Sequence, residues 1–283
     1  MKPRTMILTA AMILAVFLIT GNALCQTPLK ILISNDDGVD APGIAALAES
    51  LAKVGEVTVA APAQNKSGVS HGITANVPIA VSKSVKNGII WYIIDALPAT
   101  CVRLSLETLL PFRPDIVVSG INQGANTGTV TFYSATVAGA REAAFLGIPS
   151  ISVNLESGPG MEYKVAADFA ASLVKDIKNI GLKAGSYLNV NIPALPKEKI
   201  RGVLVVPLDT RPPQEFFEKK ADRDGKAYYW PKFRGLCAGD EKTDVWAINN
   251  GYISMTPLMI DQTAHKDMEH LKKWGSSLWG GAR

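Results

Sequence analysis

Short apolar runs alternate with amphipathic segments along the chain, and this alternation predicts strands and helices in turn. Residues 30–34 form an apolar run of strand type that ends at the polar turn of residues 35–38. Residues 42–51 then place apolar side chains at helical spacing, and residues 57–60 predict the next strand. A strand, a helix and a strand in this order are the unit of a parallel sheet.

The same alternation continues to residue 207. We expect further strands at 89–94, 115–118, 150–153, 187–192 and 203–206, and helices at 98–110, 134–146 and 163–178. This order favours helices on both faces of one sheet. The sequence therefore predicts an α/β fold over residues 24–207, a Rossmann-like, doubly wound and mostly parallel sheet.

The segment 208–242 breaks the pattern, because 15 of its 35 residues are charged and both signs are mixed. Such a stretch cannot form core, so we interpret it as a surface excursion or arm. Beyond it, residues 245–248 and 252–255 flank an Asn-Asn-Gly turn, which predicts a β-hairpin. The chain then ends in a helix with Trp274 and Trp279. Residues 208–283 are thus expected to form a C-terminal excursion, β-hairpin arm and helix.

Composition narrows the class of protein. The 283 residues are 47% hydrophobic and 19% charged, which is enough apolar material to fill a core. The net charge of +4 comes without a basic stripe, so a nucleic-acid polymer is not an expected partner. Three cysteines exclude a disulfide scaffold, and we expect Cys101 and Cys237 to be separate buried thiols.

Residues 1–23 have the order of a secretory signal peptide. Lys2 and Arg4 precede the uncharged run 6–20, and small residues at 21–23 offer a cleavage point. The run is short for a bilayer span, so no stable membrane span is expected after cleavage. The mature protein is therefore expected in the periplasm or outside the cell.

Two adjacent carboxylates, Asp36 and Asp37, come directly after the first strand, where doubly wound sheets bind their ligands. Like charges this close are costly unless a cation lies beside them. The pair therefore indicates a site for a hard divalent metal. A solvated turn with helix-capping aspartates is the alternative.

A second polar loop, residues 62–74, follows the next strand. It contains Lys66, which could supply a counter-charge for phosphate, and Ser67, which could supply an oxygen ligand. His71 lies in the same loop, and we interpret it as an ordinary loop histidine rather than a substrate contact. On its own this loop would be unremarkable, and its position after a strand is what gives it weight.

A third loop, residues 119–128, follows the strand at 115–118. It carries no charge but many amides and backbone N–H groups, a composition that suits a bound oxyanion. Ser134 and Thr136 then begin a helix, where the N–H groups and the helix dipole favour phosphate. Three such loops at one edge of a sheet are stronger evidence than any one of them.

Together the loops provide a hard cation site and an anion site. The chain has no nucleophile elbow, no dinucleotide fingerprint after the first strand and no Walker A sequence. His265 and His270 are five residues apart and lack zinc-site spacing. Oxygen-ligated Mg²⁺ or Mn²⁺ and metal-assisted hydrolysis of a phosphomonoester are therefore favoured. Either aspartate could instead act as a base or as the nucleophile.

The motifs resemble those of the SurE family, the survival-protein 5′/3′-nucleotidases, from about residue 29 to about residue 265. The N-D-D-G and S-G-I-N segments are the most specific part of the likeness. The matching segments are residues 32–38, 41–43, 61–62, 65–68, 114–122 with Gly124 and Asn126, 133–137 and 256–258.

The resemblance implies a Rossmann-like hydrolase of nucleoside 5′- and 3′-monophosphates with one divalent metal per subunit. It assigns the metal to Asp36, Asp37, Ser67 and Asn122, and the phosphate to Asn126, Ser134 and Thr136. It also implies a homodimer or homotetramer in which the C-terminal hairpin and helix are exchanged. Asn35, Lys66 and Gly120 are the further candidates for contacts with the substrate.

Three features depart from the family pattern. Ala135 stands where a glycine is usual between Ser134 and Thr136, Thr100 stands where an aspartate is usual, and most members lack a leader. Two alternatives stay open: a broad acid or polyphosphate phosphatase on the same site, and an exported nucleotide- or phosphate-binding protein without turnover.

Overall fold

The computed structural model describes residues 27–212, 215–223, 225–233 and 241–278. The expected signal peptide, Cys237 and Trp279 lie outside the described residues. Among the described residues, no helix is both long and apolar enough to cross a membrane.

One nine-stranded sheet forms the centre of the molecule, with the strand order β3-β4-β2-β1-β5-β6-β7-β11-β8. The β3–β4 and β7–β11 pairs are antiparallel and the other pairs are parallel, which confirms the predicted fold class. The strands are β1 (Leu29–Ser34), β2 (Gly55–Pro62), β3 (Val81–Lys86), β4 (Ile89–Ile94), β5 (Ile116–Gln123), β6 (Ser150–Leu155), β7 (Ser186–Ile192), β8 (Val203–Val205) and β11 (Ile253–Met259).

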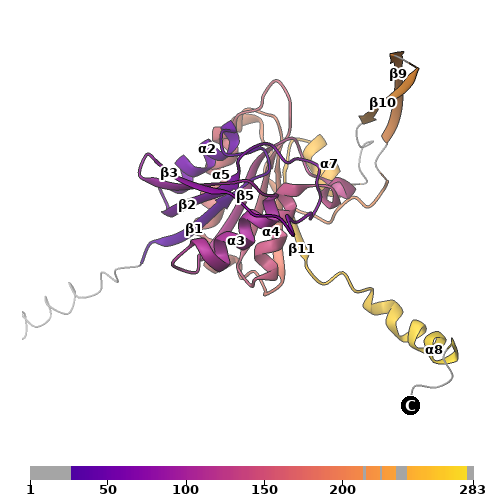
Figure 1. Cartoon of the computed structure of the whole chain (residues 1–283). Coiled ribbons are helices and arrows are strands. Elements are labelled where there is room, and N and C mark those ends of the chain that lie inside the picture. The colour runs from indigo at the N-terminus through magenta and orange to yellow at the C-terminus, as the bar shows by residue number, and fades with distance from the viewer. Residues whose placement is uncertain (1–26, 213–214, 224, 234–240, 279–283) are drawn as a thin grey trace, which may run out of the picture.

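Helices cover both faces of this sheet (Figure 1). On one face α2 (Pro42–Leu51) packs against α5 (Tyr163–Lys175), which continues into α6 (Ile177–Ile180). On the other face α3 (Pro98–Leu104), continued by the π-helical turn η1 (Ser105–Leu109), packs against α4 (Ala135–Phe145). Short 3₁₀ turns lie at η2 (Gly128–Phe132), η3 (Lys197–Lys199) and η4 (His265–Asp267).

The central strand β1 shows why the sheet has two cores. Ile31 and Ile33 are fully buried in the core under α2 and α5, while Leu32 between them is fully buried in the core under α3 and α4. Successive side chains of a strand point to opposite faces, so an uninterrupted apolar run is what a doubly covered strand requires.

The prediction of a hairpin around residues 249–251 is wrong, because the first of its two expected strands is a helix. Residues 245–248 belong to a helix, α7 (Asp244–Asn249), whose N-cap Thr243 accepts a hydrogen bond from the Trp246 N–H at 3.4 Å. Gly251, at φ +76°, ends the helix in the left-handed conformation. An Asn-Gly pair serves this helix end as readily as a hairpin turn, which explains the error.

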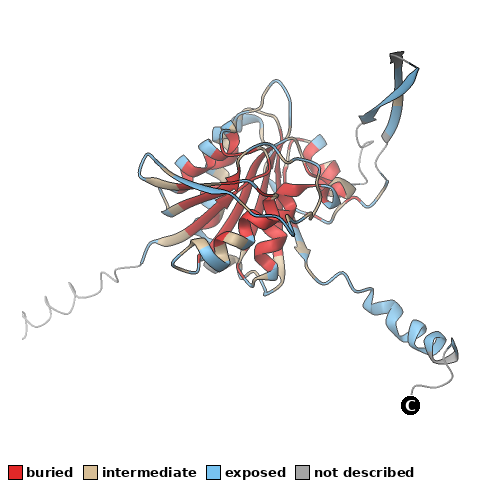
Figure 2. Cartoon of the chain, in the orientation of Figure 1, coloured by how far each residue is buried: buried red, intermediate tan, exposed pale blue. Residues whose placement is uncertain are grey.

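The chain does form a hairpin, but earlier than expected. β9 (Glu215–Arg223) and β10 (Lys226–Phe233) pair as a separate two-stranded sheet within the segment interpreted as an arm. They project from the body, as does α8 (Met268–Leu278) in a different direction (Figure 1). Both are exposed along most of their length (Figure 2).

The strand after α7, β11, lies in the main sheet between β7 and β8. The core sheet therefore continues past residue 207, where the sequence placed its boundary. Among the described elements of the C-terminal segment, the β9–β10 arm, η4 and α8 lie apart from the core.

Candidate active site

The Asp-Asp turn lies at the carboxyl end of β1, beside the ends of β2 and β5. Both ends of the Asn35 amide are used inside the turn, since Nδ2 donates to the Gly38 carbonyl at 2.8 Å and Oδ1 accepts from the Gly38 N–H at 3.2 Å. Gly38 has φ +98°, and a Cβ there would lie 3.1 Å from the Gln64 carbonyl carbon. The turn therefore requires glycine, and Asn35 shapes it.

Asp36 is 2% exposed and points toward the start of α4. The Thr136 hydroxyl donates a hydrogen bond to its Oδ1. Burial, reinforced by the neighbouring charge of Asp37, raises the pKa of Asp36 to about 6. This carboxyl is thus easily protonated unless a cation joins it.

Asp37 is half-buried and is held by the end of β5 and by the loop after β2. Its Oδ2 accepts from the Gln123 N–H at 3.3 Å and its Oδ1 accepts from the Asn65 amide at 3.5 Å. Burial raises the pKa of this carboxyl too. Its charge, together with burial, raises the pKa of Tyr163 at the start of α5, a neighbour that the sequence analysis did not identify.

The loop between β2 and β3 reaches the turn through its backbone. The Lys66 N–H donates to the Asp36 carbonyl at 2.7 Å, which places Lys66 and Ser67 beside the aspartates. Ser67 is exposed, and its N–H donates to Asn65 Oδ1 at 2.9 Å.

Gly120 and Asn122 lie inside β5 rather than in a loop, because the strand extends to Gln123. A Cβ on Gly120 would come within 2.3 Å of the Val153 carbonyl oxygen, so glycine is needed for β5 to approach β6. Asn122 uses Nδ2 to donate to the Gly124 carbonyl at 2.8 Å. The side-chain oxygen of Asn122 can still act as an acceptor. Asn122 directly precedes Gln123, whose N–H contacts Asp37.

Asn126 is turned away from the aspartates into a buried cluster of four asparagines. Its Nδ2 donates to Asn154 Oδ1 at 2.7 Å, and its N–H donates to Asn191 Oδ1 at 2.8 Å. Asn189 donates to the Asn126 carbonyl at 2.8 Å. The sequence analysis did not identify three of these asparagines, Asn154, Asn189 and Asn191, which are fully buried. Amide side chains within otherwise apolar strands are the signal that could have found them.

The N-terminus of α4 faces Asp36. Ser134 is the N-cap, and its Oγ accepts from the Val137 N–H at 3.1 Å. Thr136 and Ala135 are fully buried. A Cβ on Gly139 would lie 2.6 Å from Ser119 Oγ, so this glycine lets α4 lie close to β5. Of the predicted phosphate positions, Thr136 therefore meets Asp36 directly, and Ser134 lies two residues before it at the N-terminus of the same helix.

A buried carboxylate ties the third loop to the base of the arm. Asp244 accepts from the Gly128 N–H at 2.7 Å through Oδ2, and from the Asp209 N–H at 2.8 Å and the Val245 N–H at 2.9 Å through Oδ1. Asp244 is fully buried, and burial raises its pKa.

The residues present fit a hard divalent cation. Among the described residues no lysine, arginine or histidine forms an ion pair with Asp36 or Asp37, so two partly desolvated carboxylates lack a counter-charge. The described part of the chain also has no cluster of three or more His, Cys, Asp or Glu side chains. Hydroxyl and amide oxygens would have to complete the ligand set, which suits Mg²⁺ or Mn²⁺ better than zinc.

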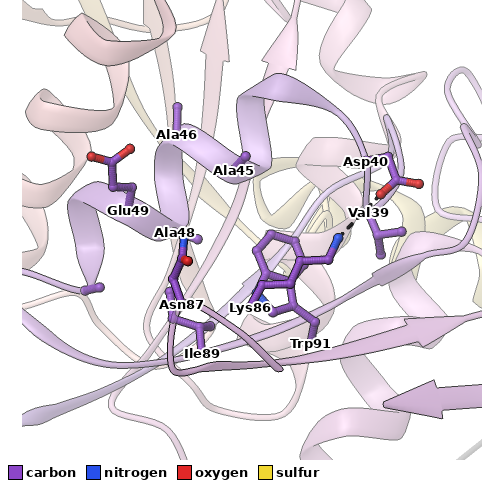
Figure 3. A pocket seen from close by; sticks show the side chains of 11 residues that line it. Val39, Asp40, Ala45, Ala46, Ala48, Glu49, Lys86, Asn87, Ile89 and Trp91 are labelled. Carbon is purple, nitrogen blue, oxygen red and sulfur yellow. Dashed lines mark hydrogen bonds and ion pairs between the residues drawn. The ribbon is translucent and has the colours of Figure 1, made fainter. Parts of the chain in front are cut away.

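A cavity of about 620 Å³ opens next to the turn, between α2 and the β3–β4 hairpin (Figure 3). Lys86 extends over the Trp91 ring at 4.9 Å and reaches Asp40 at 3.5 Å. Alanines of α2 form the opposite wall. This cavity contains neither Asp36 nor Asp37, so it is separate from the polar cluster.

Two further sequence features have clear places. Thr100, where the family pattern has aspartate, accepts from the Thr74 N–H at 2.8 Å and so holds the middle of the 63–80 loop. Cys101 is a buried free thiol, and burial raises its pKa to about 12.

Comparison with known proteins agrees with this arrangement. The family model described as survival protein SurE matches residues 31–215. The 5′-nucleotidase SurE of Geotalea daltonii is 43% identical over 248 residues, which cover 87% of this chain and 99% of that protein. The 5′-nucleotidase SurE of Geobacter sulfurreducens is 42% identical, covering 88% and 95%.

A solved structure shows the same fold. The crystal structure of the SurE protein from Aquifex aeolicus has a TM-score of 0.76 and 39% sequence identity, covering 87% of this chain and 99% of that one. A family model that matches most of the chain and relatives of this similarity leave one conclusion: the chain belongs to the SurE family.

Proposed function

We propose that the chain is a 5′-nucleotidase that hydrolyses nucleoside 5′-monophosphates, and 3′-monophosphates as well, with one Mg²⁺ or Mn²⁺ per subunit. The relatives named above are 5′-nucleotidases by name. The observation that carries the proposal is the pair of adjacent carboxylates without a described cationic partner, buried Asp36 facing the N-terminus of α4 and half-buried Asp37 beside it.

The proposed metal ligands are Asp36, Asp37, Ser67 and Asn122. A divalent cation held there would supply Lewis acidity toward the phosphate and toward the attacking water. Binding and orientation of the phosphate would come from residues of the protein. The Ser134 hydroxyl at the N-terminus of α4 would donate to a phosphate oxygen, and the helix dipole would favour the negative charge of the phosphate.

Lys66 and Thr136 have supporting roles in this mechanism. Lys66 lies beside the turn and would balance charge on the phosphate. Thr136 holds Asp36 in place through its hydroxyl and orients one carboxylate oxygen toward the ligand. Asp37, less buried than Asp36, is the better placed of the two to accept a proton from water, because it is closer to solvent.

The test is phosphate release by residues 24–283 from a panel of nucleoside 5′- and 3′-monophosphates, with Mg²⁺, with Mn²⁺ and with EDTA. We expect release that EDTA abolishes and that Asp36→Asn lowers by about 10³-fold. Asp40→Asn is the matched control, because Asp40 lies in the same segment with an 87% exposed side chain. Release that survives EDTA, or full activity of Asp36→Asn, would contradict the proposal.

The same panel separates the alternatives. Faster release from polyphosphate than from any nucleotide would indicate the broad phosphatase. Metal-independent nucleotide binding without turnover would indicate a binding protein.

We also propose export to the periplasm or beyond, with removal of residues 1–23. The charged start, apolar run and small residues at 21–23 support this. Since β1 begins at Leu29, cleavage would leave every described element intact. Fractionation of cells and N-terminal sequencing of the recovered protein test it, and an intact Met1 on protein in the cytoplasm would contradict it.

The association of subunits is part of the proposal. The arm exposes Phe217, Tyr229 and Trp230, and α8 exposes Leu278, each by more than half. Apolar surface of this kind indicates contact with another protein surface. A homodimer or homotetramer that uses the arm and α8 would cover it.

A further inference from the structure

The segment between β2 and β3, residues 63–80, contains no helix or strand, yet it carries Lys66 and Ser67. A loop this long needs fixed points if it is to hold a ligand in place. The bond from the Lys66 N–H to the Asp36 carbonyl is one such point. A second lies at His71, four residues beyond Ser67.

His71 reaches across to α4 and contacts Glu142. Its Nε2 lies 2.8 Å from Glu142 Oε2, and its ring centroid is 5.3 Å from that of Phe145. The other ring nitrogen, Nδ1, is buried without a partner among the described residues. The bond to Glu142 is therefore the polar attachment that fixes the side chain.

Glu142 is a carboxylate at the junction of three elements. It is 1% exposed, belongs to α4, and its Oε1 accepts from Arg103 Nε of α3 at 2.5 Å. Burial alone would raise the pKa of Glu142, but the bonds from His71 and Arg103 outweigh it and hold the pKa below its usual value. An ionised acceptor makes both of these hydrogen bonds strong.

Further bonds attach the same loop to its neighbours. Ser70 Oγ donates to the Phe132 carbonyl at 2.5 Å, and the Ser70 N–H donates to the Tyr133 carbonyl at 3.0 Å. These carbonyls belong to the segment just before Ser134. The loop is thus fastened on both sides of the α4 N-terminus.

The contacts close a ring around the aspartates. Asp36 is bonded to Thr136 at the start of α4, Glu142 lies further along that helix, His71 binds Glu142, and the chain returns from His71 to Lys66 and Asp36. Arg103 fastens α3 to α4 without touching the loop. His71 is consequently the member whose loss would open this ring and loosen the loop, while Arg103 keeps the helices joined.

We propose that His71 and Glu142 form a latch that positions the loop bearing Lys66 and Ser67 against the Asp36–Asp37 turn. The inference rests on the proposed function, and it makes both residues positioning residues that do not touch the substrate. Loss of such a supporting contact typically costs 10–100-fold in metal affinity or activity.

The test compares His71→Ala, His71→Gln and the wild type. Hydrogen exchange of metal-free protein is the first readout, and we expect the Lys66 amide in His71→Ala to exchange about tenfold faster or more. Titration with Mn²⁺ is the second, with an expected rise in Kd of about tenfold or more. The kcat and KM of phosphate release are the third, with kcat/KM falling by a similar factor.

His71→Gln should restore most of each property, because its amide can still donate to Glu142. His265→Ala is the matched control, since His265 also pairs with a carboxylate, Asp261 at 2.7 Å, but is exposed and far along the chain. Wild-type exchange and a Kd for Mn²⁺ within twofold in His71→Ala would overturn the latch. So would a His71→Gln that is as inactive as His71→Ala with its loop protected, because the ring itself would then be needed.

Phosphate release by the wild type tests the proposed function separately from the latch. If it releases no phosphate with any metal, that proposal fails, while the exchange readout still decides whether His71 holds the loop.

Discussion

Burial of polar and apolar side chains differs between two regions of the molecule. One region is the end of the sheet at which the aspartates lie, and the other consists of the two appendages, the β9–β10 arm and α8. At this end of the sheet, polar side chains such as Asp36, Glu142 and Asn154 are buried and hydrogen-bonded. In the appendages, apolar side chains such as Trp230 and Leu278 are exposed. A single chain completes the first region, whereas the second needs another surface to cover it. The difference separates the part that we propose for chemistry from the part that we propose for association.

Substitution of Asp244 is expected to have the largest effect, because this residue joins the third loop to the base of the arm. Asp244→Ala leaves three buried N–H groups without an acceptor, and we expect the free energy of unfolding to fall by about 3 kcal/mol. Phosphate release should fall too, because Gly128 loses its anchor. Urea denaturation with Asp267→Ala, an exposed aspartate, as control measures this. A loss below about 0.5 kcal/mol would show that the arm base is independent of the site.

Burial of the Asp36 carboxyl makes the stability of the fold depend on pH. Its folded pKa of about 6 lies above the usual 3.8, so the protonated form stabilises the fold and this stability is lost as pH rises through 6. In metal-free protein at pH 8, Asp36→Asn should therefore be more stable than the wild type, by about 3 kcal/mol at most.

The advantage of Asp36→Asn should shrink as pH falls toward 4, because the folded carboxyl is then protonated and the pH approaches the ordinary pKa of 3.8 that applies to the unfolded chain. Denaturation in EDTA at the two pH values is the measurement, with exposed Asp40→Asn as control. An advantage independent of pH would mean that desolvation of the charge is not its cause.

The arm gives the smallest expected effect on the core. Tyr229→Ser with Trp230→Ser should lower the mass of the particle in sedimentation and change the stability of the core by no more than about 0.5 kcal/mol. Val85→Ser, which replaces an exposed apolar residue of the edge strand β3, should leave the mass unchanged. Retention of the wild-type mass by the arm variant would remove the arm from the interface.

Local patterns predicted much of the fold and the aspartate turn. β1 and β5 are short apolar runs followed at once by polar residues, and Asp36 and Asp37 are adjacent in sequence. The edge strand β3 was missed because it carries only two apolar residues, Val81 and Val85, among polar ones. The helix α7 was missed because Asn-Gly ends helices as well as hairpins.

Contacts between distant segments account for what could not be predicted. His71 and Glu142 are 71 residues apart, and Asn126 meets Asn191 across 65. Neither pairing has a local signal, since each depends on how α4 and β7 are placed by the sheet. The family resemblance assigns Asn126 to phosphate, and the bonds that Asn126 makes to β6 and β7 had no sign in the sequence.

The bond between the Asp209 N–H and Asp244 has a consequence for how the fold can vary. The chain leaves the body after β8 and re-enters it before β11 at a single point, and these two strands are hydrogen-bonded neighbours. The arm is therefore an insertion whose length is unconstrained by the sheet, because lengthening or shortening a loop with fixed ends costs little. A chain with this layout can exchange the arm, and with it the proposed contact between subunits, while the sheet that carries Asp36 and Asp37 is inherited unchanged.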